Sequence, residues 1–244
     1  TVQDNRKWGD ASYSVFYRFH QGGFQAEETA STAIALQATA AQPEKAVTLT
    51  LQPERVAGRT AGFGGNYCFQ YDSPVTDFTL RTLDNAWVRT EADLADWEPE
   101  NDNDDPRDTD VEALAARDAP GSVLRKRFRL WQEIARKKIP TCVSVWSLPG
   151  WMYENPDGDR NAYGRRVRPE MWPEMIECIA SYLAYARSRY GIEHDLFSFN
   201  EPDAGIRVHF RAEEHLRAIA DIGARLRSLG LKTRLLLGDV ARPD

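Results

Sequence analysis

The sequence predicts an α/β fold in which short buried strands alternate with amphipathic helices. From residue 61 onward, each apolar run of strand length is followed by a segment with apolar side chains at helical spacing. Gly, Pro and Ser mark the boundaries between these segments. Such alternation is typical of βαβ units with parallel strands. An open doubly wound sheet and a (β/α)8 barrel are both built in this way, and the pattern leaves both arrangements open.

Five strands and four intervening helices are predicted. The strands are at residues 62–68, 86–89, 140–146, 196–199 and 235–237, and the helices at 73–83, 124–134, 172–190 and 216–229. Ser73 as N-cap with Pro74 after it predicts the start of the first helix. Gly191 and Gly230 predict the ends of the third and fourth helices. Residues 91–121 are expected to form one long acidic loop.

Residues 1–60 are predicted to be a β-rich accessory segment, distinct from a domain at 61–244. Apolar and Thr residues alternate over 47–51, which is the period of a half-buried strand. Further strands are expected near 13–19 and 34–36. This is a small β layer that could need additional strands from elsewhere.

Composition limits the classes of partner. The 244 residues carry a formal net charge of −6, which gives no electrostatic reason to bind a phosphate backbone. No apolar stretch approaches the roughly 20 residues that a membrane-spanning helix needs. We therefore expect neither a nucleic acid nor a membrane as partner. The chain opens on Thr1, which a cleaved leader or a shortened chain would both explain, and a secreted or periplasmic location is favoured over a cytoplasmic one.

No metal or other cofactor is expected. Three cysteines match no zinc spacing, and Cys142 and Cys178 lie in apolar patterns typical of buried free thiols. The acidic segment 98–110 could be a calcium loop, since Asp and Asn oxygens are hard ligands. It lacks the glycine and terminal Glu of an EF-hand loop, and a solvated acidic loop is the favoured interpretation. Its carboxylates are Glu98, Glu100, Asp102, Asp104, Asp105, Asp108 and Asp110.

Polar and aromatic side chains gather where the predicted strands end. They are Arg89, Trp146, Trp151, Asn200, Glu201 and Asp239. Because the carboxyl ends of parallel strands meet at one edge of a sheet or barrel, we expect these groups to lie close together. The apolar run 196–199 would place Glu201 at this edge. The alternative is that Glu201 merely caps the next helix.

The strand-end motifs resemble those of clan A glycoside hydrolases. Asn200-Glu201-Pro202 after the fourth strand is similar to the signature of that clan, and the Gly62–Gly65 turn and residues 144–152 resemble glycoside hydrolase family 30 and its relatives. The resemblance covers residues 47–244. The acidic insert at 91–121 departs from the common pattern, which leaves a neighbouring family open. The resemblance implies a (β/α)8 TIM-type barrel with about five of its eight strands present.

The resemblance also implies roles for the strand-end residues. Glu201 matches the general acid/base of a retaining enzyme that acts on a β-linked oligo- or polysaccharide. Asn200 would bind the sugar 2-hydroxyl, and Arg89 would orient the nucleophile. Trp146 and Trp151 would wall the sugar pocket. Asp239 could bond a sugar hydroxyl or simply finish the fifth strand.

The same resemblance places the nucleophile on a seventh strand, beyond the five predicted here. We therefore expect a fragment or one part of a split barrel, inactive alone, whose partner is the missing C-terminal half. Two other interpretations stay open: a non-catalytic carbohydrate-binding barrel, and an open-sheet α/β enzyme of unrelated chemistry. Strand order in the structure separates the second of these from a barrel.

Overall fold

The computed structural model describes residues 2–4, 13–15, 50, 62–155, 165–204 and 207–241. The chain divides into two compact units, Thr1–Val56 and Ala57–Asp244. In the first unit, β1 (Val2–Asp4) pairs antiparallel with β2 (Tyr13–Val15), which lies within a predicted strand. The strand expected at 34–36 lies outside the described residues, as does the one at 47–51 apart from residue 50. The assignment of 1–60 as an accessory domain stays a prediction.

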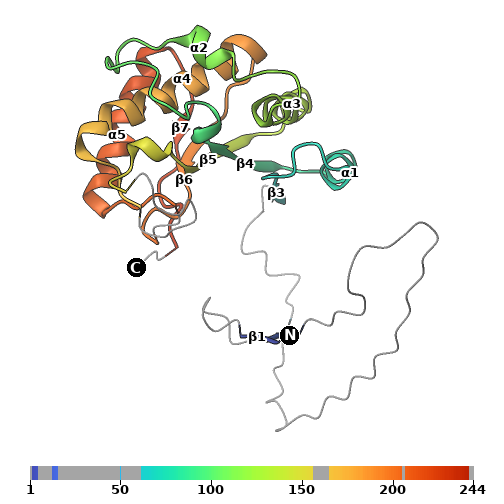
Figure 1. Ribbon diagram of the computed structural model, residues 1–244. Helices are drawn as coiled ribbons and strands as arrows, with labels where there is room; N and C mark the ends of the chain where they lie inside the picture. The colour runs from blue at the N-terminus through green and yellow to red at the C-terminus, as the bar shows by residue number, and fades with distance from the viewer. Residues whose placement is uncertain are drawn as a thin grey trace, which may run out of the picture. The chain divides into compact units, whose positions relative to one another are not determined.

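The second unit contains a five-stranded parallel sheet in the order β3-β4-β5-β6-β7 (Figure 1). Its strands are β3 (Gly64–Asn66), β4 (Trp87–Asp93), β5 (Thr141–Ser147), β6 (Leu196–Phe199) and β7 (Arg234–Leu235). The connecting helices are α1 (Pro74–Thr82), α3 (Val123–Arg136), α4 (Trp172–Tyr190) and α5 (Ala212–Ser228). The α/β fold with five parallel strands is therefore confirmed.

Strand order distinguishes the two arrangements that the sequence left open. Within the described sheet, every strand lies beside its neighbour in the chain, which is the order of a (β/α)8 barrel. A doubly wound sheet reverses its strand order at a switch point, and these five strands contain no such reversal. The doubly wound alternative does not fit this sheet.

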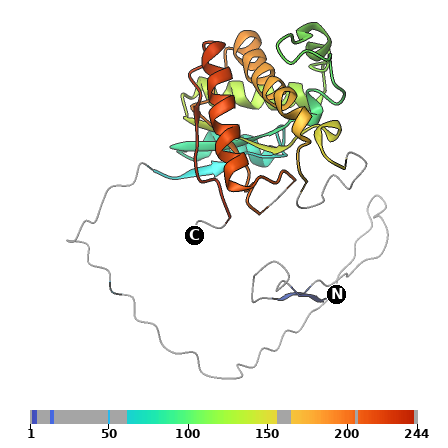
Figure 2. The ribbon, with the colours of Figure 1, turned by 90° about the vertical axis from the view of Figure 1, so that its left-hand side faces the viewer.

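The two faces of the sheet differ in chemistry because side chains alternate along each strand. Val143 and Val145 of β5, with Phe197 and Phe199 of β6, are buried in the apolar core with α3, α4 and α5. Figures 1 and 2 show α4 and α5 side by side over this face. Ser144 lies between Val143 and Val145, so its side chain is on the opposite face of the sheet, where it is level with Ser198. The helices therefore cover one face and leave polar groups on the other.

The predicted helix boundaries agree with the structure where capping residues set them. Ser73 Oγ accepts a hydrogen bond from the Thr76 amide at 3.1 Å, and Pro74 is the first residue of α1. Gly191 ends α4 with a φ of 69°, in the left-handed region that favours glycine. Gly230, at a φ of 70°, follows the end of α5 in the same way.

The prediction of one long loop over 91–121 is wrong, as is the interpretation of 98–110 as wholly solvated. Strand β4 continues to Asp93, η2 (Leu94–Asp96) follows it, and α2 (Val111–Ala115) lies further along. Trp97 is completely buried, and its ring packs against Tyr182 and Tyr185 of α4. Apolar residues such as Trp97 attach the charged segment to the core. The high charge of the segment as a whole did not indicate this attachment.

Two compositional expectations can be compared with the described residues. Cys142 and Cys178 are buried free thiols, as predicted, and Cys68 is also free. No helix in the described part of the chain is both long and apolar enough to cross a membrane.

Candidate active site at the carboxyl ends of the strands

Arg89 is the centre of a polar network on the face of the sheet opposite α4 and α5. Its Nη2 donates to Asn200 Oδ1 at 2.7 Å and to Asp239 Oδ2 at 2.9 Å, and its Nε donates to Ser144 Oγ at 3.0 Å. The network brings together β4, β5, the end of β6 and the segment after β7. It therefore joins three predicted site residues, Arg89, Asn200 and Asp239.

Two serines complete this network, although the sequence did not identify them as site residues. Asp239 Oδ2 accepts hydrogen bonds from Ser198 Oγ at 2.6 Å and from Ser144 Oγ at 3.1 Å, in addition to Arg89. Each serine interrupts an apolar strand on the face opposite its buried neighbours. That alternation was a usable signal, because a small polar residue on an inner strand face needs a hydrogen-bonding partner.

The Asn200–Glu201 pair follows directly after β6. The Asn200 amide donates to Val145 O at 2.9 Å, which prolongs the strand pairing by one residue. Glu201 then has a φ of 44°, a left-handed conformation that costs a non-glycine residue about 1–3 kcal/mol. Its amide donates to Asp239 O at 3.1 Å, and its side chain is half-buried. The strained turn therefore holds Glu201 beside the Arg89 network rather than in a helix cap.

Asn200 has one unused polar group. The residue is only 4% exposed, and its Nδ2 has no hydrogen-bond partner in the described part of the chain. Its Oδ1 is held by Arg89. A buried amide donor without a partner costs about 1–3 kcal/mol, and a ligand hydroxyl would satisfy it.

Aromatic rings lie beside the network. The Arg89 guanidinium is 5.8 Å from the ring centroid of Trp146 on β5. The Phe69 ring meets Trp146 edge-on at 5.4 Å and is 55% exposed. The structure thus places Trp146 with Arg89, as predicted, and adds Phe69, which the sequence did not single out.

Trp151 is held by a different part of the chain. It lies in the 3-10 turn η3 (Gly150–Met152), and its indole N–H donates to Glu98 O at 3.1 Å. The described contacts connect it to the acidic segment, and none joins it to Arg89. On the neighbouring strand β3, Asn66 is the residue level with Arg89.

Glu91 positions the segment that carries Phe69. Its Oε1 accepts hydrogen bonds from the Phe69 amide at 2.8 Å and from the Tyr71 hydroxyl. Burial raises the pKa of this carboxyl. Tyr71 in turn accepts a hydrogen bond from the buried Arg127 of α3 at 3.0 Å. Glu91 therefore ties the segment of Phe69 and Tyr71 to β4 through one carboxylate oxygen, while its Oε2 is buried without a hydrogen-bond partner in the described part of the chain.

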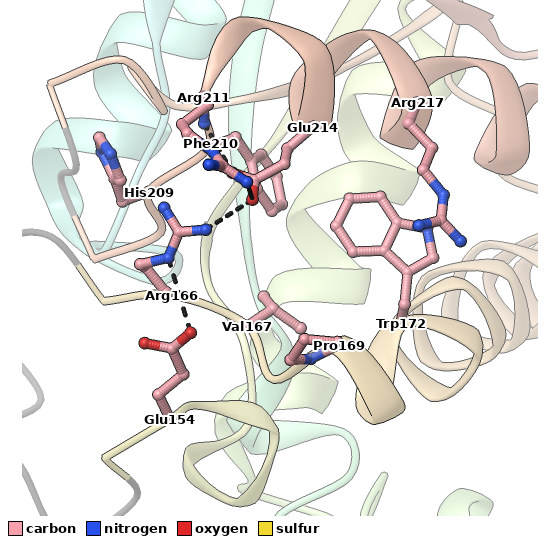
Figure 3. A pocket seen from close by; sticks show the side chains of 10 residues that line it. All are labelled: Glu154, Arg166, Val167, Pro169, Trp172, His209, Phe210, Arg211, Glu214 and Arg217. Carbon is pink, nitrogen blue, oxygen red and sulfur yellow. Dashed lines mark hydrogen bonds and ion pairs between the residues drawn. The ribbon is translucent and has the colours of Figure 1, made fainter.

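A separate hollow of about 290 Å³ lies between the β5–α4 and β6–α5 connections (Figure 3). Arg166 forms ion pairs there with Glu214 at 2.5 Å and Glu154 at 3.6 Å. Figure 3 also shows Trp172 and His209 on its walls. The Arg89 network is the stronger candidate site, because it includes the buried Asn200 Nδ2, a donor without a partner in the described part of the chain.

Comparisons with known proteins find similarity at the level of structure. No protein-family model and no curated protein sequence matches the chain. It is similar to SrfJ from Salmonella typhimurium, with 21% identity, a TM-score of 0.48, and coverage of 71% of this chain and 43% of that one. It is also similar to the glycoside hydrolase family 30 subfamily 8 xylanase Xyn30A from Clostridium acetobutylicum, with 18% identity, a TM-score of 0.49, and coverage of 70% of this chain and 41% of that one. The β-glycosidase from Thermosphaera aggregans has 12% identity to the chain and a TM-score of 0.45, and the match covers 68% of this chain and 42% of that one. The chain thus spans about two fifths of the length of these three structures, which include a xylanase of glycoside hydrolase family 30 and a β-glycosidase.

Proposed function

We propose that this chain carries the acid/base part of a retaining glycoside hydrolase that acts on a β-linked oligo- or polysaccharide. The observation that supports this most directly is the position of Glu201. Glu201 follows the fourth strand of a parallel sheet whose strands lie in chain order. Its backbone is in the left-handed conformation, and its amide donates a hydrogen bond to the carbonyl oxygen of Asp239. In barrel enzymes of this architecture, reacting groups stand at the carboxyl ends of the strands.

The proposed reaction needs a proton donor that later becomes a proton acceptor. Glu201 would protonate the leaving glycosidic oxygen, and would then take a proton from the water that hydrolyses the glycosyl-enzyme intermediate. Its half-buried side chain can reach a bound sugar, and a half-buried position is compatible with exchange of the proton with water. The buried, unpartnered Nδ2 of Asn200 would donate to the sugar 2-hydroxyl, a bond that strengthens in the transition state.

The remaining site residues would bind and orient the sugar. Arg89 would hold the attacking carboxylate in place, and Asp239, through its ion pair, would hold Arg89 while accepting a hydrogen bond from a sugar hydroxyl. The rings of Trp146 and Trp151 would pack against sugar C–H groups. The nucleophile itself is proposed to come from a strand-seven Glu of the complete barrel, outside the five strands described.

The test is Glu201→Gln in a protein that contains the complete barrel. We expect hydrolysis of a natural β-linked substrate to fall by about 10²–10⁴-fold, because its leaving group requires protonation. An aryl β-glycoside with a good leaving group should lose much less rate in its glycosylation step. Added azide should restore turnover on the aryl substrate and give a β-glycosyl azide product.

Glu213→Gln is the matched control, since Glu213 is an exposed carboxylate at the start of α5. It should leave both rates unchanged. Equal losses on both substrates in Glu201→Gln would show that Glu201 is not the acid. A wild-type protein that binds oligosaccharides and cleaves none would instead identify a non-catalytic carbohydrate-binding barrel.

A further inference from the structure

The acidic segment after β4 folds back onto helix α4. Trp97 Nε1 donates to Ser181 Oγ of α4 at 2.9 Å, and Thr109 Oγ1 donates to Glu177 Oε1 of the same helix. Both η2 and α2, on either side of the segment, contact α4, and Figure 1 shows α2 beside it. The segment is therefore attached to α4 near both of its ends.

Three carboxylates meet where the segment lies on the helix. Glu98, Asp102 and Glu177 each offer an oxygen, and these oxygens all lie within 4.8 Å of one another. Glu98 is 0% exposed and Glu177 is 2% exposed, while Asp102 is half-buried. Removing charged carboxylates from water costs several kcal/mol for each one unless a counter-charge accompanies them.

The hydrogen bonds of this cluster are incomplete. No described residue donates a hydrogen bond of ordinary geometry to either oxygen of Glu98 or to Glu177 Oε2. Burial raises the pKa of Glu98, and the Cys178 thiol and the Asp102 backbone amide lower it by a smaller amount, but neither forms a hydrogen bond of ordinary geometry with the carboxylate. Buried carboxylate oxygens are normally paired or coordinate a metal. One oxygen from each of Glu98, Asp102 and Glu177 lies within 4.8 Å of the others, and the buried Glu98 carboxylate has no hydrogen bond of ordinary geometry in the described part of the chain, which together indicate a missing ligand.

The surroundings supply negative charge in excess. Burial raises the pKa of Glu174, which lies one turn before Glu177 on α4, and the charges of Asp102, Asp104 and Asp105 raise it further. The positive group that acts on Glu177 is Arg225 of α5, and its effect is smaller than that of burial. A cation that binds here would enter a field that favours it from several sides.

We propose that Glu98, Asp102 and Glu177 form a binding site for one Ca²⁺ ion that fastens the acidic segment to α4. The donor set consists of oxygens, which suits a hard cation rather than zinc. Ca²⁺ binds oxygens at about 2.3–2.6 Å, so two ligand atoms of one ion can lie up to about 5 Å apart. The separation within the cluster fits this limit. Neither oxygen of Glu98 has a hydrogen bond of ordinary geometry in the described part of the chain, so both would bind the ion together, and water would fill the remaining positions.

The site would also stabilise a candidate substrate-binding residue. Glu98 contributes its side chain to the cluster and its carbonyl oxygen to the Trp151 indole. An ion held by Glu98 would therefore restrict the position of Trp151. This consequence depends on the proposed function, whereas the cation site itself does not.

The experiment is calcium titration of the full-length protein after removal of cations with EGTA. We expect one Ca²⁺ per chain by calorimetry, a rise in Tm, and weaker binding of Mg²⁺, which prefers shorter bonds and retains its water. The heat should vary with the ionisation enthalpy of the buffer, because burial and neighbouring charge make Glu98 and Glu177 retain protons that the ion displaces.

Two variants and a control make the test specific. The double variant Glu98→Gln, Glu177→Gln should abolish the calcium response. Asp102→Asn should weaken calcium binding at least about tenfold. Because Asp102 is only half-buried, this second substitution tests the site without changing a buried side chain. Asp108→Asn, an exposed carboxylate of the same segment that is not among the aspartates acting on Glu174, should bind as the wild type does. No binding by folded wild-type protein, unchanged binding in Asp102→Asn, or equal affinity for Mg²⁺ would overturn the proposal.

Discussion

At the scale of single residues, the candidate active site is marked by groups that the fold leaves strained or unpaired. Glu201 has a left-handed backbone, and Asn200 Nδ2 and Trp146 Nε1 are buried without hydrogen-bond partners in the described part of the chain. Each of these costs stability, by about 1–3 kcal/mol for a buried unpaired group. Such costs are typical of positions that a ligand later satisfies, which supports the proposed sugar-binding role.

Glu98 and Glu177 make a separate prediction about pH. Burial, together with neighbouring carboxylates, raises the pKa of Glu98 to about 8 and that of Glu177 to about 7. In the unfolded chain both titrate near 4.5. Between about pH 4.5 and 8 the folded state thus binds more protons than the unfolded state, so the free energy of unfolding should decrease as pH rises through this window.

Urea denaturation in EGTA at several pH values measures this slope. Glu98→Gln cannot ionise, so its free energy of unfolding should fall less steeply between pH 5 and 8 than that of the wild type. Asp104→Asn controls for the loss of one acidic charge from the same segment. Identical slopes in Glu98→Gln and the wild type would contradict the prediction.

At the scale of elements, α1 depends on its cap more than the longer helices do. Its buried side chain is Leu80, whereas Val75 and Phe78 are 67% and 58% exposed. A helix of nine residues is too short to be stable through propensity alone. The hydrogen bond from the Thr76 amide to Ser73 Oγ is therefore a substantial part of what holds its first turn.

We expect Ser73→Ala to lower the free energy of unfolding by about 1 kcal/mol, because the Thr76 amide loses its acceptor. Ser73→Gly should cost only a few tenths of a kcal/mol, since glycine is tolerated at this position and leaves the amide open to water. Hydrogen exchange of the α1 amides, with urea denaturation, checks both values. A loss in Ser73→Gly as large as in Ser73→Ala would contradict the capping argument.

At the scale of the whole molecule, large apolar side chains are exposed at both outer strands of the described sheet. Phe63, just before β3, is 86% exposed, and Leu237, just after β7, is 65% exposed. An outer strand with exposed apolar groups is a template for pairing with further strands or other chains. The complete barrel that we propose would cover these positions.

The 244-residue polypeptide, prepared by itself, should therefore hydrolyse no glycoside and should aggregate readily. The proposed acid is present, but a retaining enzyme also needs a carboxylate at about 5–5.5 Å from it to act as nucleophile. Aryl β-glycoside assays and light scattering on the purified chain check this prediction. Turnover that disappears in Glu201→Ala would contradict it. Asp239, the carboxylate paired with Arg89, would then be the first nucleophile to test, with Asp239→Asn.

The sequence determined the local elements and the strand-end motif. Alternating apolar periods predicted the five strands and four connecting helices, because burial of one face requires that spacing. Capping residues such as Ser73 and Gly191 predicted helix ends, because the orphan groups of a helix need those side chains or conformations. The same reasoning predicted that Arg89, Asn200 and Asp239 would meet, since parallel strands end at one edge.

Only the tertiary structure decided which groups became partners across the fold. Alternation indicated the face of Ser144 and Ser198, but not that both would donate to Asp239. The carboxylates around Glu98 had the pattern of a solvated loop. Trp97 draws that loop into the core, and Glu98 comes to lie against Glu177, a residue of a helix far along the chain. The sequence around Glu98 indicates how exposed the segment is on average. Whether one carboxylate in it is buried depends on contacts with residues far along the chain, which the local sequence does not contain.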